Sequence, residues 1–291
     1  MTVTEVGIRR VTNATDDATQ PFWGDRSPTC RAPPLRKGAP LTSDVKPWGR
    51  WATLGLALVA MLVGQAVALP VLIWWYGLGL VQLAHLAADG VAITLVVCIS
   101  TPVQVLLLVL MARRRGTSAA DYLALTLPRK RDVVAGIVTV VVCILVGNGI
   151  GWLFGRPIVS QFQLDIYRTA SAAGYLPWLW LTLVVVGPIG EETLFRGFLF
   201  RGWHRTPRDV WLVIIVTALF WAVGHLQYDL YFLGQVFASG LVLGWFRWVS
   251  GSTILTMLLH GLFNFEGMVE TFLTLHGVHK ILHLPIAQAG Y

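Results

Sequence analysis

The chain has 291 residues, of which 55% are hydrophobic and 13% are charged, and its formal net charge is +7. A soluble domain carries about 25% charged residues, so this composition excludes a soluble globular enzyme, a disordered chain and a coiled coil. The apolar runs are continuous and about twenty residues long, which matches membrane-spanning helices and not the alternating strands of an outer-membrane barrel. We therefore predict an all-α fold, a polytopic transmembrane helical bundle.

The first fifty residues differ from the rest of the chain. Residues 1–50 are rich in Thr, Pro, Asp and Arg and show no hydrophobic period, so we expect a disordered cytoplasmic tail. The apolar run that starts at Trp51 continues beyond the small residues Ala66-Val67-Ala68, which favours an uncleaved first span over a signal peptide.

About seven apolar runs follow the tail, and we predict one transmembrane helix for each of them. The expected spans are 51–76, 91–112, 133–154, 176–200, 210–227, 230–246 and 253–275. The first three form a region of N-terminal transmembrane helices, residues 51–154, and the remainder a second membrane region, residues 155–291.

The basic residues gather in loops on one side of the bundle if the seven spans alternate in direction. These residues are Arg113, Arg114, Arg115, Arg129, Lys130, Arg131, Arg201, Arg205, Arg208 and Arg247, together with those of the tail. The positive-inside rule then places the amino terminus in the cytoplasm and the carboxy terminus outside. The same rule explains the positive charge without a nucleic-acid partner, and the short Arg-rich loops favour a bacterial inner membrane.

A few ionisable and polar residues lie inside the apolar runs, where they are costly and therefore candidates for function. They are Glu191, Glu192 and Arg196 in the fourth span, His225 in the fifth, and His260, Asn264 and Glu266 in the seventh.

Helix geometry sorts the acids of the fourth span. Glu192 and Arg196 are one turn apart in the order that favours an ion pair, which lowers the cost of burying both. Glu191 lies about 100° round the helix from Glu192 and has no basic neighbour one turn away. We expect its partner on another helix, among His225, His260 and Asn264.

The seventh span presents His260 and Asn264 on one face. Glu266 lies about 200° from Asn264, so we expect it to point elsewhere. Counted along the helices, Glu191 and His260 lie roughly 15 and 12 Å from the cytoplasmic side, whereas His225 lies roughly 22 Å from it. A shared site therefore requires tilt, or a fifth span that starts inside the membrane.

Three motifs in one order resemble a known family. Residues 191–196 read E-E-x-x-x-R, residues 260–264 read H-x-x-x-N, and His225 occupies the place of the His in an F-x-x-x-H motif. The chain resembles the CPBP family of intramembrane proteases, also called the CAAX protease and bacteriocin-processing (Abi) family, over roughly residues 176–270. This makes residues 155–291 a CPBP-like catalytic transmembrane domain. One position departs from the pattern, because Trp221 stands where the motif has Phe.

The resemblance implies roles for the matching residues. Glu191 would activate a water, and His225, His260 and Asn264 would hold that water and stabilise the oxyanion. Glu192 and Arg196 would support the site, and Trp221 would take the packing role of the missing Phe. Peptide hydrolysis needs these parts in any fold, namely a base, a donor for the developing negative charge, and water.

The predicted function is therefore an intramembrane endopeptidase that acts on a peptide or membrane-protein substrate within the lipid bilayer. A divalent metal such as zinc is a second way to activate the water, with Glu191, His225 and His260 as ligands, although no H-E-x-x-H motif is present. Two other functions stay open. One is a catalytically silent membrane scaffold, and the other is a proton-coupled transporter that uses the same acids as a relay.

Overall fold

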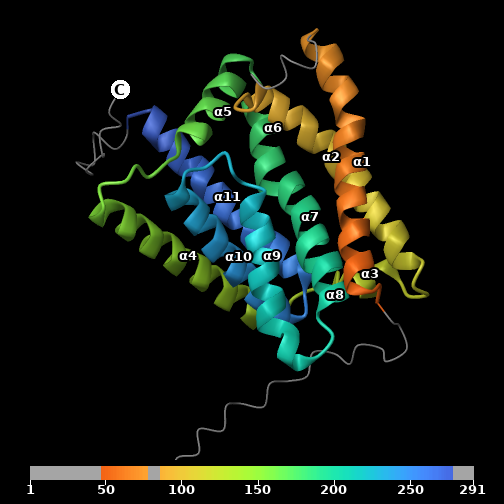
Figure 1. Cartoon of the computed structure of the whole chain (residues 1–291). Coiled ribbons are helices and arrows are strands. Elements are labelled where there is room, and N and C mark those ends of the chain that lie inside the picture. The colour runs from red at the N-terminus through yellow and green to blue at the C-terminus, as the bar shows by residue number, and fades with distance from the viewer. Residues whose placement is uncertain (1–46, 78–85, 278–291) are drawn as a thin grey trace, which may run out of the picture. The chain divides into compact units, whose positions relative to one another are not determined.

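Every regular element in the described part of the chain is a helix. The structure is a computed structural model that describes residues 47–77 and 86–277, so most of the predicted tail lies outside the described residues. The predicted all-α bundle is confirmed (Figure 1). Its long helices are α1 (Arg50–Tyr76), α2 (Gly90–Arg113), α4 (Lys130–Leu153), α10 (Leu230–Ser250) and α11 (Thr253–Leu275).

The predicted fourth span is one continuous rod built from five helical segments. They are α6 (Leu176–Leu181), η2 (Thr182–Val186), α7 (Gly187–Glu192), η3 (Thr193–Leu199) and α8 (Phe200–Trp203), of which η2 and η3 are π-helical. π-Helical turns are rare and occur frequently at functional sites. Here they flank the two adjacent glutamates.

Five of the described helices are long and apolar enough to cross a membrane: α1, α2, α4, the α6–α8 rod and α10. The predicted seven helices are all present, but two of them are not in this group. The helix α9 (Val210–Val223) has 14 residues, so it is about 21 Å long, short of a hydrocarbon core of about 30 Å. The helix α11 has 23 residues but carries several polar side chains.

The structure adds short helices that the hydropathy pattern does not reveal. The helix α5 (Gln161–Ala172) begins with a capping box in which the Ser160 and Gln163 side chains bond to each other's backbone. It packs against α2 and α11. The others are α3 (Ala119–Tyr122) and the 3₁₀ turn η4 (Pro207–Asp209).

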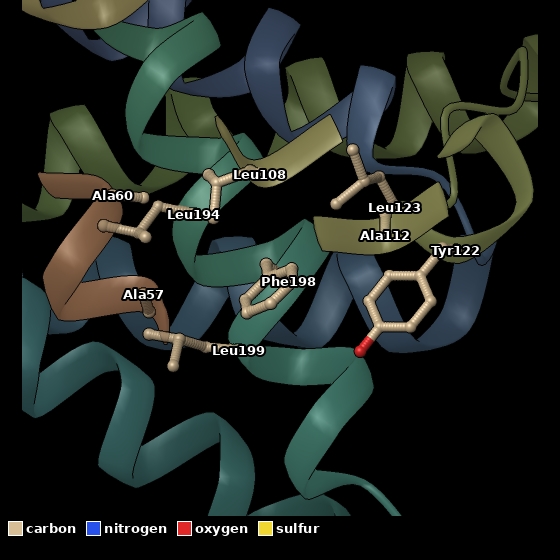
Figure 2. Packing of buried hydrophobic residues seen from close by; sticks show 9 residues of the cluster. All are labelled: Ala57, Ala60, Leu108, Ala112, Tyr122, Leu123, Leu194, Phe198 and Leu199. Atoms are coloured by element: carbon tan, nitrogen blue, oxygen red, sulfur yellow. The ribbon is translucent and has the colours of Figure 1, made fainter. Parts of the chain in front are cut away.

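The central rod packs against α1 and α2 on one side and against α9, α10 and α11 on the other, with α4 beyond α10 and α11 (Figure 1). Figure 2 shows how η3 is held. Leu194, Phe198 and Leu199 pack with the small residues Ala57 and Ala60 of α1 and with Leu108, Ala112, Tyr122 and Leu123. Small residues at such contacts let membrane helices approach closely. The segment that follows Glu192 is thereby fixed in the middle of the bundle.

One end of the bundle, which we call the basic end, contains the start of α1 and the ends of α2, α8 and α10. The Trp48 indole N–H donates to the Met111 carbonyl at 3.1 Å, and the Trp203 indole N–H donates to the Arg50 carbonyl at 3.0 Å. The backbone N–H of Thr253, at the start of α11, donates to the Ala124 carbonyl at 2.9 Å. These contacts gather the predicted basic loops at one end, as the alternating spans require.

Candidate active site

A cavity of about 1200 Å³ lies within the bundle, and all four predicted catalytic residues line it. Glu191 comes from α7, His225 from the turn after α9, and His260 and Asn264 from α11. The sequence prediction that these side chains share one site agrees with this geometry. Glu266 also lines the cavity, so the expectation that it points elsewhere is wrong, because the cavity extends along α11 beyond the face shared by His260 and Asn264.

Glu192 is the centre of a fully buried charged cluster. Its Oε1 accepts a hydrogen bond from an Arg196 terminal nitrogen at 2.8 Å and another from His260 Nδ1 at 3.0 Å. The side chains of Glu192 and Arg196 have no exposed surface, and that of His260 has 3%. The predicted ion pair one helical turn apart is therefore confirmed. Arg196 also donates to the Gly240 carbonyl at 3.0 Å, which ties the rod to α10.

His260 is bound to Glu192 and not to Glu191. The prediction that Glu191 finds a histidine or Asn264 as its partner is wrong in this respect, because α11 packs against the side of the rod that carries Glu192. A carboxylate partner requires that Nδ1 carry the proton, so Nε2 of a neutral His260 is an acceptor. Glu192 thus fixes both the orientation and the tautomer of this ring.

Glu191 is half-buried at the cavity wall, and its partner is Trp221. The Trp221 indole N–H donates to Glu191 Oε2 at 2.5 Å. The Trp221 ring also lies 4.9 Å from the Arg196 guanidinium and meets the rings of His225 and His260 edge-on, at 5.2 and 5.0 Å. The departure from the F-x-x-x-H pattern therefore supplies a hydrogen-bond donor that phenylalanine lacks.

His225 lies in the turn that follows α9, outside any helix. The predicted span 210–227 is too long, because α9 ends at Val223 and Gly224 caps it. The Nδ1 atom of His225 lies 2.8 Å from the Trp221 carbonyl, and its ring is stacked with Tyr228. Since a carbonyl only accepts, Nδ1 carries the proton here too, and Nε2 is left for the cavity.

Asn264 connects α11 to the π-helical segment η2. Its side-chain amide donates to the Leu183 carbonyl at 2.7 Å. This bond uses one of the two amide hydrogens, so a second hydrogen is available at the cavity wall.

The three residues considered as zinc ligands are not grouped as a metal site in the part of the chain that the structure describes. Within residues 47–77 and 86–277, no three His, Cys, Asp or Glu side chains are grouped so that they could hold a metal ion. Trp221 holds Glu191 through Oε2, and Glu192 holds His260 through Nδ1. These bonds leave Glu191 Oε1 and His260 Nε2 unused, so the metal alternative stays a prediction.

Glu270 and Asn148 are among the cavity residues that the sequence analysis missed. Glu270 accepts a hydrogen bond from the Asn148 side-chain amide at 2.5 Å, and both residues line the cavity. Glu270 follows Glu266 by one turn of α11 and interacts with it. An acid four residues after another acid, opposite an asparagine in an apolar run, is the signal that could have identified this pair.

The apolar helices define a multi-pass membrane protein, and the cavity is lined by residues from several of these helices. Residues 173–265 match the Rce1-like family, described as Type II CAAX prenyl endopeptidase Rce1-like. This match confirms, over the matched residues, the resemblance to the CPBP/CAAX protease family that the motifs indicate.

A curated relative is similar to part of the chain, and its name states no activity. The chain is 37% identical over 129 residues to an uncharacterized 24.3 kDa protein of Escherichia coli, and the match covers 38% of this chain. The chain spans 59% of the length of that relative. No solved structure matches the chain.

Proposed function

We propose that this protein is an intramembrane endopeptidase that hydrolyses a peptide bond with water activated by Glu191. One observation carries the proposal: Glu191, His225, His260 and Asn264 line a single cavity in the segment that matches a protease family. All four residues come from the region 155–291, while α2 and α4 contribute walls to the cavity.

Glu191 is suited to the role of general base. Its Oε2 is held by the Trp221 N–H, so Oε1 is the oxygen that takes a proton from water. The resulting hydroxide attacks the carbonyl carbon of the substrate and forms a C–O bond. When the C–N bond breaks, the proton passes from Glu191 to the leaving amine, which restores the carboxylate.

Asn264 and the two histidines are placed for the remaining tasks. The free amide hydrogen of Asn264 is the donor proposed for the oxyanion. The Nε2 atoms of His225 and His260 are the ring nitrogens not used by the Trp221 carbonyl and by Glu192, and we assign them to holding the water and the substrate. Glu192 and Arg196 fix His260 from behind, without touching the reacting atoms.

The proposed substrate is a peptide or a membrane-protein segment that reaches the cavity from the bilayer. The proposed location is a bacterial inner membrane, with the basic end and the amino terminus in the cytoplasm, because basic residues favour that side. A substrate bond near the level of Glu191 would then be cut toward the cytoplasmic leaflet.

The test uses membranes as the source of substrate. Purified protein is added to detergent-solubilised membranes from cells that lack it, and new peptide termini are identified by mass spectrometry. The wild-type protein should generate termini that Glu191→Gln reduces about 100-fold or more, while Glu266→Gln, a carboxyl in the same cavity, should keep most of the cleavage. Wild-type cleavage by Glu191→Gln would exclude Glu191 as the base.

A transporter is the second candidate, because the polar lining of the cavity continues along α11 to Glu266, Glu270 and Asn148. A chain of acids across a membrane domain is typical of a proton relay. Proteoliposomes loaded with a pH-sensitive dye separate the two functions. A proton flux that Glu270→Gln abolishes would favour the transporter. Peptide cleavage without a proton flux would favour the peptidase.

A further inference from the structure

Arg247 is a buried cation without an anionic partner among the described residues. It lies in the last turn of α10 and is 8% exposed. Its Nε–H donates to the Arg196 carbonyl at 2.8 Å, and its guanidinium lies 5.2 Å from the centre of the Phe200 ring. No residue of the described ranges accepts a hydrogen bond from its two terminal nitrogens, so its strongest donors are unused.

The neighbours of Arg247 add positive charge. Arg201 at the end of α8 acts on it electrostatically, and both arginines act on His204. The Nε of Arg201 and the Nε2 of His204 are also buried without a hydrogen-bond partner in the described part of the chain. Burial lowers the pKa of His204, and the charge of Arg247 lowers it further.

The two nearby carboxylates are already engaged elsewhere. Asp209, which acts on His204, is paired with Arg50 at 2.9 Å and accepts from the Thr206 backbone N–H at 3.1 Å. Asp121, which acts on Arg201, accepts from the Ser118 hydroxyl at 2.7 Å. Neither carboxylate neutralises Arg247.

A buried charge of this kind is costly unless it is paired and hydrogen-bonded. Arg196, which is also buried, donates both to the Glu192 carboxylate and to the Gly240 carbonyl. An anion bound from outside the protein would give Arg247 the equivalent partner. A phosphate suits a guanidinium, because it accepts two parallel hydrogen bonds.

The position of the cluster indicates where such a phosphate comes from. Arg247 lies beside a group of three tryptophans, in which Trp245 contacts Trp211 and Trp248 at ring distances of 5.3 and 4.9 Å. Tryptophans gather at the level of the lipid headgroups, and basic pockets between helices at this level bind anionic headgroups.

We propose that Arg201, His204 and Arg247 form a binding site for the phosphate of an anionic phospholipid headgroup. The terminal nitrogens of Arg247 donate to the phosphate oxygens, and Arg201 supplies a second positive charge. The bond from Arg247 Nε to the Arg196 carbonyl joins this site to the rod that carries Glu192. The proposal does not depend on the peptidase activity.

Lipid binding to the delipidated full-length protein tests the proposed headgroup site. The protein is titrated in detergent with phosphatidylglycerol or phosphatidylcholine and observed by native mass spectrometry. Bound phosphatidylglycerol should exceed phosphatidylcholine, and Arg247→Gln should weaken the anionic lipid about tenfold or more. The matched control is Arg208→Gln, an exposed arginine at the same end of the bundle, which should bind as the wild type does.

Three further comparisons make the outcome decisive. Arg201→Gln, at a half-buried position, provides a second variant if Arg247→Gln does not fold, and it should weaken binding several-fold. Inorganic phosphate that competes at millimolar concentration would identify the same anion site with a free phosphate as its occupant. Equal weakening by Arg208→Gln and Arg247→Gln, or no weakening by Arg247→Gln and Arg201→Gln, would overturn the proposal.

Discussion

The two adjacent glutamates of the central rod lie in opposite environments. Glu192 is sealed in the bundle and bound by Arg196 and His260, whereas Glu191 lies at the cavity wall and is bound by the neutral Trp221 N–H. A carboxylate neutralised by two basic partners stabilises the fold and is a poor base. A carboxylate with one neutral donor and one free oxygen retains its capacity to take a proton. A rotation of about 100° per residue thus separates the buried, charge-paired acid from the acid that we propose as the base.

The largest effect on stability should come from removing the Glu192 carboxylate from the buried charged cluster. Glu192→Leu leaves Arg196 as an uncompensated buried charge, and we expect a loss of about 3–5 kcal/mol in the free energy of unfolding. Unfolding in mixed micelles by a denaturing detergent measures it. Glu191→Gln, at the half-buried position, should lose about 1 kcal/mol or less.

A double variant sharpens this contrast. Glu192→Leu combined with Arg196→Met removes both charges, so most of the lost stability should return. Cleavage should not return with it, because His260 has lost the carboxylate that orients its ring. A double variant as unstable as Glu192→Leu would show that the ion pair is not the source of the stability.

A smaller effect is expected on the cavity side from Trp221→Phe, which restores the residue of the F-x-x-x-H pattern and removes the N–H that holds Glu191. We expect kcat to fall about tenfold, since one hydrogen bond to the reacting carboxylate is lost, while KM changes little. Peptide cleavage kinetics measure both constants. The matched control is Trp180→Phe, because Trp180 contacts the Phe265 ring at 5.6 Å and does not line the cavity. An unchanged kcat in Trp221→Phe would mean that the indole only packs.

The smallest expected effect is the pH dependence of stability that His204 causes. The pKa of His204 is lowered in the folded protein, by burial first and by Arg247 second, so the unfolded chain binds a proton more readily. Stability should therefore be fully present above the ordinary histidine pKa of about 6.5 and decline as the pH falls below it. The thermal midpoint of the delipidated protein between pH 7.5 and about 5 checks this. His204→Asn should flatten the decline, and identical curves would contradict the assignment.

The sequence predicted the parts of the site that follow from helix periodicity. The spacing of Glu192 and Arg196 sets their ion pair, and the spacing of His260 and Asn264 places both at the cavity. The sequence did not predict the partner of Glu191. The donor is the indole of Trp221, and the family pattern has Phe at this position, whose ring forms no such hydrogen bond.

The remaining errors concern features that hydropathy does not record. The π-helical turns of η2 and η3 have the same apolar composition as an α-helix. The predicted span 210–227 continues past Gly224, which caps α9 after Val223. Packing between segments about 70 residues apart decides which side of the rod α11 covers. This packing therefore also decides which glutamate His260 contacts.

The short helix α9 has a consequence for the surrounding lipid. With 14 residues it is about 21 Å long, roughly 9 Å less than the hydrocarbon thickness of a typical bilayer. Such a hydrophobic mismatch is relieved when the bilayer thins locally beside the short segment. The turn that carries His225 follows the carboxyl end of α9 directly. Thinning there would bring headgroups and water close to Gly224 and His225, which line the cavity.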